Sequence, residues 1–78
     1  MLRYKLKELL SEKSFREGRK VTLEEVANAT GINRATLSKL NNPLGHNTTT
    51  NNLDALCKYF NCPLSELVEY FPDDRNQL

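Results

Sequence analysis

The chain has 78 residues and a formal net charge of +1. A chain of this length forms one domain and buries only roughly 60% of the surface that it exposes when unfolded, which leaves little room for the deep, water-excluding pocket of an enzyme. It contains three glycines and three prolines and no low-complexity stretch, a composition that favours a folded domain over disorder.

Positive and negative charges are divided unevenly along the sequence. Residues 1–50 contain nine Lys or Arg and five Glu, a balance of +4, whereas residues 51–78 contain two Lys or Arg and five Asp or Glu, a balance of −3. A basic first part and an acidic second part predict a polarised molecule with one face suited to a polyanion. A chance distribution of solvated charges is the alternative interpretation.

Targeting and redox signals point to the cytoplasm. The start, MLRYKLKELLSEK, lacks the apolar run of a signal peptide, and no stretch approaches the ~20 apolar residues of a membrane span. Cys57 and Cys62 have no second pair, which matches neither a zinc finger nor a disulfide framework. We therefore expect reduced, packed thiols, no metal, no cofactor and no membrane association.

A first helix is predicted from residue 2 to about residue 14. Four leucines recur there at helical spacing: Leu2, Leu6, Leu9 and Leu10. Phe15 is expected to pack at the end of this helix, and residues 17–20 are typical of a loop.

A second helix is predicted to begin at Thr22, because Thr22 and Glu25 have the spacing of a capping box. This helix should run to about Ala29. Its expected buried face consists of three residues: Leu23, Val26 and Ala27.

Gly31 and Asn33 indicate a tight corner between the second helix and a third. Gly31 suits a chain that leaves a helix with positive φ, and Asn33 can cap the helix that follows. The third helix should direct Leu37 and Leu40 inward, with Ile32 as a further anchor, while Ala27 allows the two helices to approach closely. Two short helices joined by about three residues predict a helix-turn-helix.

The remaining elements are two further helices. Thr48, Thr49 or Thr50 can cap the fourth helix, whose inward residues recur at helical spacing: Leu53, Leu56, Tyr59 and Phe60. Pro63 suits the first turn of a fifth helix, which is expected to end at Pro72 and to use four apolar residues: Leu64, Leu67, Val68 and Phe71. Because no strand pattern is visible, we expect an all-α bundle over residues 1–72 and a frayed tail over residues 73–78.

The sequence resembles the phage repressor and Cro-type (Xre) helix-turn-helix family. Two runs carry the resemblance, VTLEEVANATGINRATLSKLNN and LDALCKYFNCPLSELVEYF, and it covers roughly residues 6–71. The resemblance implies a five-helix, lambda-repressor-like domain with its helix-turn-helix at the second and third helices. It also implies sequence-specific binding of double-stranded DNA and control of transcription, often as a homodimer. We expect the protein to regulate transcription from a short operator, with repression favoured over activation.

The family's base-reading positions fall on five residues of the third helix and its start: Asn33, Arg34, Ala35, Ser38 and Lys39. Arg34 can donate two hydrogen bonds to guanine, and Lys39 can reach guanine or a phosphate. Ala35 can contact a thymine methyl, and Ser38 specifies little. Arg34 and Lys39 as ordinary solvated charges are the alternative interpretation.

Phosphate contacts are expected around the starts of the second and fourth helices. The candidates are Thr22, Asn42, His46, Asn47, Thr48, Thr49 and Thr50, with charge added by Arg16, Arg19 and Lys20. The run NTTTNN could equally be a polar loop that caps a helix. The sequence departs from the family pattern at Leu23, where many members have a phosphate-binding Gln, and in the loop NNPLGHNTTT, which has no Lys or Arg.

Two further features leave alternatives open. Tyr70 and Phe71 could close the core or form a dimer interface. A protein-interaction module with the same fold, such as an antitoxin or adaptor, is the alternative function, although Arg34 and Lys39 argue against it. We expect no enzyme, because His46 has no nucleophile nearby and no paired carboxylates or phosphate-cradling glycine loop occur, and no small-molecule ligand is evident.

Overall fold

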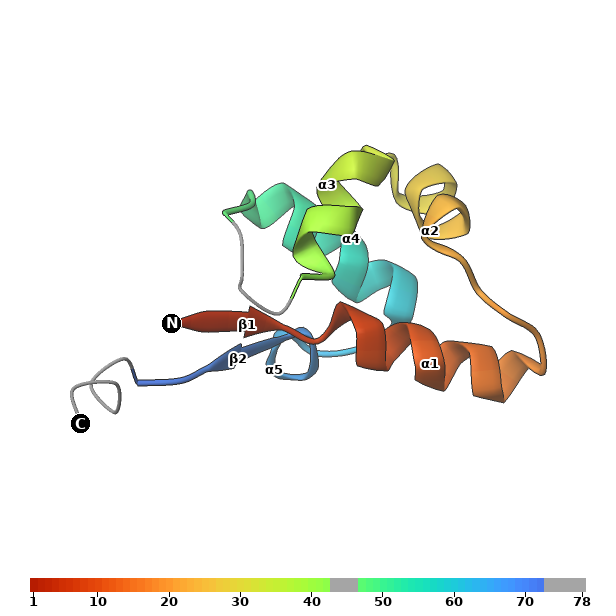
Figure 1. Ribbon diagram of the computed structural model, residues 1–78, viewed down its shortest axis with the longest axis horizontal. Coiled ribbons are helices and arrows are strands. Elements are labelled where there is room, and N and C mark those ends of the chain that lie inside the picture. The colour runs from red at the N-terminus through yellow and green to blue at the C-terminus, as the bar shows by residue number, and fades with distance from the viewer. Residues whose placement is uncertain (43–46, 73–78) are drawn as a thin grey trace.

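The fold is a bundle of short helices with a small sheet at one end (Figure 1). The computed structural model describes residues 1–42 and 47–72. In chain order the elements are β1 (Leu2–Tyr4), α1 (Leu6–Glu17), α2 (Leu23–Thr30), α3 (Arg34–Leu40), α4 (Thr50–Phe60), α5 (Leu64–Leu67) and β2 (Val68–Tyr70). The predicted five-helix fold is therefore confirmed, whereas the expectation that the chain has no strands is wrong. The predicted tail, 73–78, lies outside the described residues.

The sheet joins the two ends of the described chain. β1 and β2 are antiparallel, with Leu2 opposite Tyr70 and Tyr4 opposite Val68. The N–H of Phe71 donates to the carbonyl of Met1 over 2.8 Å, and the N–H of Lys5 donates to the carbonyl of Leu67 over 2.7 Å. These backbone bonds extend the pairing at both ends of the short ladder.

The sheet corrects two predicted helix boundaries. Residues 2–4 pair as a strand, so the first helix begins at Leu6 and not at Leu2. The fifth helix ends at Leu67, because the chain then becomes extended at Val68 with φ −125° and ψ 136°. Val68 and Phe71 are therefore not on a helix, and Leu64, expected to face inward, is 54% exposed.

Every helix contributes to a single core. The most deeply buried side chains are Leu6, Val26, Leu37, Leu40, Leu56 and Leu67, all at most 1% exposed. Ala27, Tyr59 and both cysteines pack against this core, and the cysteines are free thiols. Burial raises the pKa of the Cys62 thiol, with Cys57 adding to the effect. The predicted inward leucines of α1, α3 and α4 are thus confirmed as core or as packed against it, but Phe15 is 87% exposed and its predicted packing is wrong.

Side-chain caps fix the beginnings of three helices. Thr22 Oγ1 accepts from the N–H of Glu25 over 3.2 Å, Asn33 Oδ1 accepts from the N–H of Ala35 over 2.7 Å, and Thr49 Oγ1 accepts from the N–H of Asn52 over 3.1 Å. All three hydrogen bonds satisfy first-turn N–H groups that lack a partner within the helix. Thr49 is therefore the cap among the three candidate threonines.

Candidate nucleic-acid interface

The corner between α2 and α3 is built by local hydrogen bonds. Gly31 takes φ 78°, and its N–H donates to the carbonyl of Ala27 over 2.9 Å, which ends α2. Thr30 Oγ1 donates to the carbonyl of Val26 over 2.7 Å and accepts from the N–H of Ile32 over 3.2 Å. The side chain of Ile32 is 7% exposed and anchors the turn in the core. The predicted three-residue corner is confirmed.

The two sides of α3 differ sharply in exposure. Leu37 and Leu40 are 0% and 1% exposed and seat the helix in the core. The predicted base-reading residues all lie on the exposed side: Asn33, Arg34, Ala35, Ser38 and Lys39. Small side chains at Ala35 and Ser38 leave the backbone of this side open to close approach, with Arg34 and Lys39 projecting beside them.

The charged residues of α3 are all basic. Its sequence, RATLSKL, contains two basic residues and no acidic one. Within residues 1–42 and 47–72, no ion pair involves Arg34 or Lys39. A helix with this arrangement can hydrogen-bond to guanine edges or to phosphates when it lies in a major groove.

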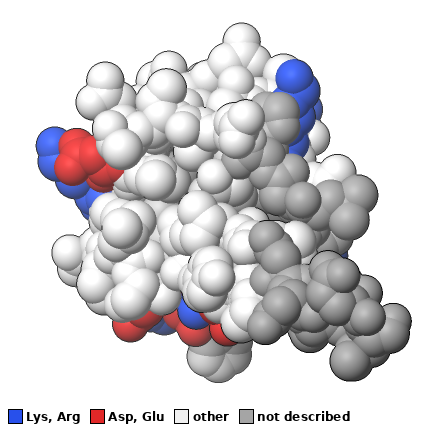
Figure 2. All heavy atoms as spheres, turned by 90° about the vertical axis from the view of Figure 1, so that its left-hand side faces the viewer, with Lys and Arg blue, Asp and Glu red and all other residues white. Residues whose placement is uncertain are grey.

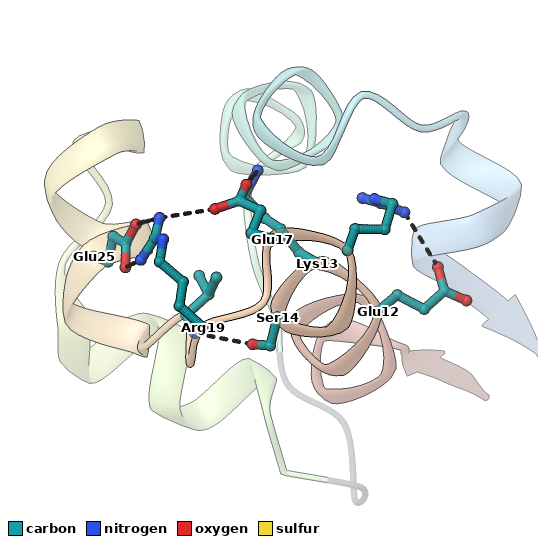
Figure 3. A network of polar contacts seen from close by, with 8 residues as sticks. Glu12, Lys13, Ser14, Glu17, Arg19 and Glu25 are labelled. Carbon is teal, nitrogen blue, oxygen red and sulfur yellow. Dashed lines mark hydrogen bonds and ion pairs between the residues drawn. The ribbon is translucent and has the colours of Figure 1, made fainter.

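Arg19, by contrast, is held by two carboxylates (Figure 3). Its Nη1 donates to Oε1 of Glu25 over 2.9 Å, and its Nη2 lies 2.5 Å from Oε2 of Glu25 and 2.8 Å from Oε1 of Glu17. The hydrogen bonds from Arg19 are the main cause that lowers the pKa of Glu25, and the same contacts raise the pKa of Arg19. The guanidinium thus links the loop after α1 to the first turn of α2.

The ion pairs continue from Arg19 to α4. Lys13 Nζ lies 2.8 Å from Oε2 of Glu17, and this hydrogen bond is the main cause that lowers the pKa of Glu17. The same Nζ lies 4.9 Å from the ring centroid of Tyr59. Desolvation raises the pKa of Tyr59. This network, which we call the Arg19 network (Lys13, Glu17, Arg19, Glu25 and Tyr59), connects α1, α2 and α4.

The predicted phosphate-binding residues have different surroundings. Arg16 lies 3.9 Å from Glu12, whereas no described acidic group pairs with Lys20. Thr22 and Thr49 are used as caps, and Thr48 Oγ1 accepts from Asn52 Nδ2 over 3.0 Å. Asn42, Asn47 and Thr50 are exposed. His46 lies outside the described residues.

One residue near this surface has no special signal in the sequence. Lys7 of α1 lines an open hollow of about 560 Å³ together with Lys20 and Arg34. In the sequence Lys7 is one more charged residue between inward leucines, and only the folded chain brings it beside Lys20 and Arg34. The spacing of Lys7, Ser11 and Ser14, which share one helix face, is the one pattern that could have indicated it.

Three other features were compared with the described residues: a metal site, a membrane-spanning helix and the predicted dimer residues. Within them no three His, Cys, Asp or Glu side chains cluster as metal ligands would, and no helix has the length and apolar character needed to cross a membrane. Tyr70, a predicted dimer residue, is 68% exposed, whereas Phe71 is half-buried.

The comparison with protein families agrees with this geometry. A family profile described as Cro/C1-type HTH DNA-binding domain matches residues 5–73, nearly the whole chain. Neither the curated proteins nor the solved structures gave a match. The matching family is one of DNA-binding domains and not of enzymes, and the corner between α2 and α3 lies within the matched residues. The chain belongs to the Cro/C1-type helix-turn-helix family of DNA-binding domains.

Proposed function

We propose that this protein is a sequence-specific repressor of transcription that binds a short operator in double-stranded DNA. The observation that carries the proposal is the contrast across α3, where Leu37 and Leu40 are buried and Arg34 and Lys39 are exposed without an acidic partner among the described residues. In the proposed complex α3 lies in the major groove. Arg34 donates to guanine O6 and N7, and Lys39 reaches a guanine or a phosphate.

The remaining residues of this surface have supporting roles in the proposal. Ala35 contacts a thymine methyl, and Asn33 and Ser38 add hydrogen bonds at the start and middle of α3. Phosphates are bound near the starts of α2 and α4, where first-turn N–H groups and the helix dipole favour an anion. Since Arg19 is engaged by Glu17 and Glu25, we assign more of the phosphate binding to Lys20 than to Arg19.

The experiment that tests this function is selection of binders from random duplex DNA at low salt. The proposal predicts enrichment of one short sequence. If no sequence is enriched, operator binding is refuted, and a protein-interaction module becomes the better account. A reporter with the enriched sequence placed inside its promoter then distinguishes the direction of control, because a repressor lowers transcription when it occupies that site.

We further propose that the protein binds its operator as a homodimer that uses the end of the molecule bearing the sheet. Leu2 and Tyr70 face each other across the two strands and are 51% and 68% exposed, a large apolar area for so small a protein. The described surface at this end is mostly uncharged (Figure 2). A two-fold dimer would present two α3 helices about one DNA turn, roughly 34 Å, apart.

Light scattering tests the dimer with and without the selected duplex. The proposal predicts two copies of the chain on each duplex and an enriched sequence with two-fold symmetry. Tyr70→Ser should weaken assembly without changing the base preference. One copy on an asymmetric site would contradict the dimer while leaving DNA binding intact.

A further inference from the structure

The hollow between α1 and the helix-turn-helix is lined by positive charge from three separate segments. Lys7 comes from α1, Lys20 from the loop before α2, and Arg34 is the first residue of α3. Serine and threonine hydroxyls lie between them, from Ser11 and Thr22 among others. None of the described residues that line it is acidic. We call it the lysine hollow (Lys7, Ser11, Lys20, Thr22 and Arg34).

The cations of the lysine hollow are not neutralised by the protein. Within the described ranges no ion pair involves Lys7, Lys20 or Arg34. The acidic residue that follows Lys7, Glu8, is instead held by Arg3, with Nη2 2.6 Å from Oε2. Like charges that converge on one concave surface repel one another and attract a counter-anion.

The chemistry of the lining fits a phosphate group. Lysine ammonium groups bind phosphate as point charges, and an arginine can add directed hydrogen bonds. Hydroxyl side chains are further donors to phosphate oxygens. The lysine hollow also adjoins the first turn of α2 through Thr22 and Leu23, where N–H groups point outward from an eight-residue helix.

The position of Arg34 connects this hollow to the bases. Arg34 belongs both to the lining of the hollow and to the exposed side of α3. The hollow is therefore adjacent to the first turn of α3, where we propose that a base is contacted, and the backbone of that DNA strand would run near it. The hollow is open, so a phosphodiester within a strand could enter it.

We infer that the lysine hollow seats a phosphodiester of the operator strand, and that Lys7 of α1 is a DNA-binding residue together with Lys20. This inference deepens the proposed function and rests on it. Lys7 replaces, from another helix, the phosphate contact that Leu23 cannot make with an apolar side chain. The hollow thereby fixes the register of α3 against the backbone.

Duplexes with a single neutral methylphosphonate test this assignment. Each member of the series replaces one phosphate of the selected sequence. We expect that neutralising one particular phosphate weakens DNA binding by the wild type. Neutralising the same phosphate should cause no further loss of affinity in Lys7→Gln or Lys20→Gln, which already lack the contact. Lys58→Gln is the matched control, because Lys58 is an exposed lysine of α4 that pairs with Asp54 over 3.0 Å and does not line the hollow. Neutralising the same phosphate should weaken DNA binding by Lys58→Gln as much as it weakens binding by the wild type.

The salt dependence of binding gives an independent readout. Removal of one phosphate contact should reduce the magnitude of the slope of log K against log [salt] by about one. The affinity lost between about 50 and 200 mM salt should therefore be roughly fourfold smaller for Lys7→Gln than for the wild type. The enriched sequence should stay the same. A wild-type slope and wild-type methylphosphonate profile for Lys7→Gln would overturn the inference alone, whereas failure of the wild type to bind any duplex would overturn the proposed function with it.

Free phosphate is the other source of the same chemistry. Chloride can be replaced by inorganic phosphate at constant ionic strength. The phosphate should then compete with the DNA duplex no better for binding to the wild type than for binding to the Lys7→Gln, Lys20→Gln double variant. Selective competition with the wild type, combined with a DNA salt slope that does not depend on Lys7, would overturn the assignment to the DNA backbone. Thermal unfolding of each variant verifies that the exposed lysines can be replaced without loss of the fold.

Discussion

The two guanidinium nitrogens Nη1 and Nη2 of Arg19 contact the two carboxylate oxygens of Glu25, so the loop after α1 is fastened to the first turn of α2. A bidentate pair of this kind fixes direction as well as distance. Since α2 carries α3 through the corner at Gly31, the pair helps to set how the helix-turn-helix sits against α1. Arg19 is thus better explained as a positioning residue than as the phosphate contact that its charge suggests.

The Arg19 network predicts a specific dependence of stability on pH. The pKa values of Glu17 and Glu25 are lowered from the ordinary 4.5 in the folded protein, mainly by Lys13 and Arg19 respectively. Their contribution is therefore fully present above about pH 4.5 and is lost as the pH falls through the folded-state pKa values. Glu25→Gln should be less stable than the wild type near neutral pH, and the difference should vanish in acid and shrink at high salt.

Chemical denaturation at a series of pH values measures this effect. Glu12→Gln is the control, since Glu12 and Arg16 are 68% and 60% exposed and 3.9 Å apart, so its curve should follow that of the wild type. A constant difference between Glu25→Gln and the wild type across the acid range would contradict the role of the ion pair.

Gly31 should tolerate asparagine better than alanine. A Cβ at this position would meet no atom within 4 Å, so the cost of substitution comes from the backbone alone, which is held at φ 78°. Alanine should lower the free energy of unfolding by about 1–2 kcal/mol. Asparagine adopts left-handed backbone more readily, as Asn61 does in this chain at φ 53°, so Gly31→Asn should lose less. Equal denaturation midpoints for Gly31→Ala and the wild type would contradict a need for positive φ here.

Thr49 should matter for stability through its hydroxyl. Its Oγ1 caps α4 by accepting from the N–H of Asn52, so Thr49→Ala should cost about 1 kcal/mol, whereas Thr49→Ser should keep most of the stability. Urea denaturation of the three proteins gives the comparison. If Ala and Ser variants are equally destabilised, the methyl group and not the cap is responsible.

The helix-turn-helix could be predicted from the sequence because its signals are local. Thr22, Gly31 and Asn33 act on backbone groups within a few residues, and these same residues form the caps and the corner in the structure. The strands could not be predicted, because a strand of three residues is too short to show an alternating pattern. The strand that pairs with β1 is also distant in the sequence, with Leu2 opposite Tyr70 and Tyr4 opposite Val68.

Two side chains show what the helical pattern does not determine. Phe15 is six positions after the buried Leu9, which places it about 240° around the helix axis and away from the core. The hydrophobic character of Phe15 predicts packing against the core, but its angular position on the helix directs the side chain into solvent. Lys7 lies on α1, Lys20 in the loop before α2 and Arg34 on α3, so their proximity depends on the tertiary structure and not on local sequence.

Base reading by the exposed side of α3 is tested most directly when the random-duplex selection is repeated with Arg34→Ala. Arg34 is exposed, so its replacement should leave the fold intact, as circular dichroism can verify. A bidentate contact to guanine contributes roughly 1–3 kcal/mol of discrimination, so the variant should lose its preference at one base pair of each half-site and keep it elsewhere. An unchanged preference at every position, with affinity weakened equally on all sequences, would contradict base reading by Arg34 and make it a phosphate contact.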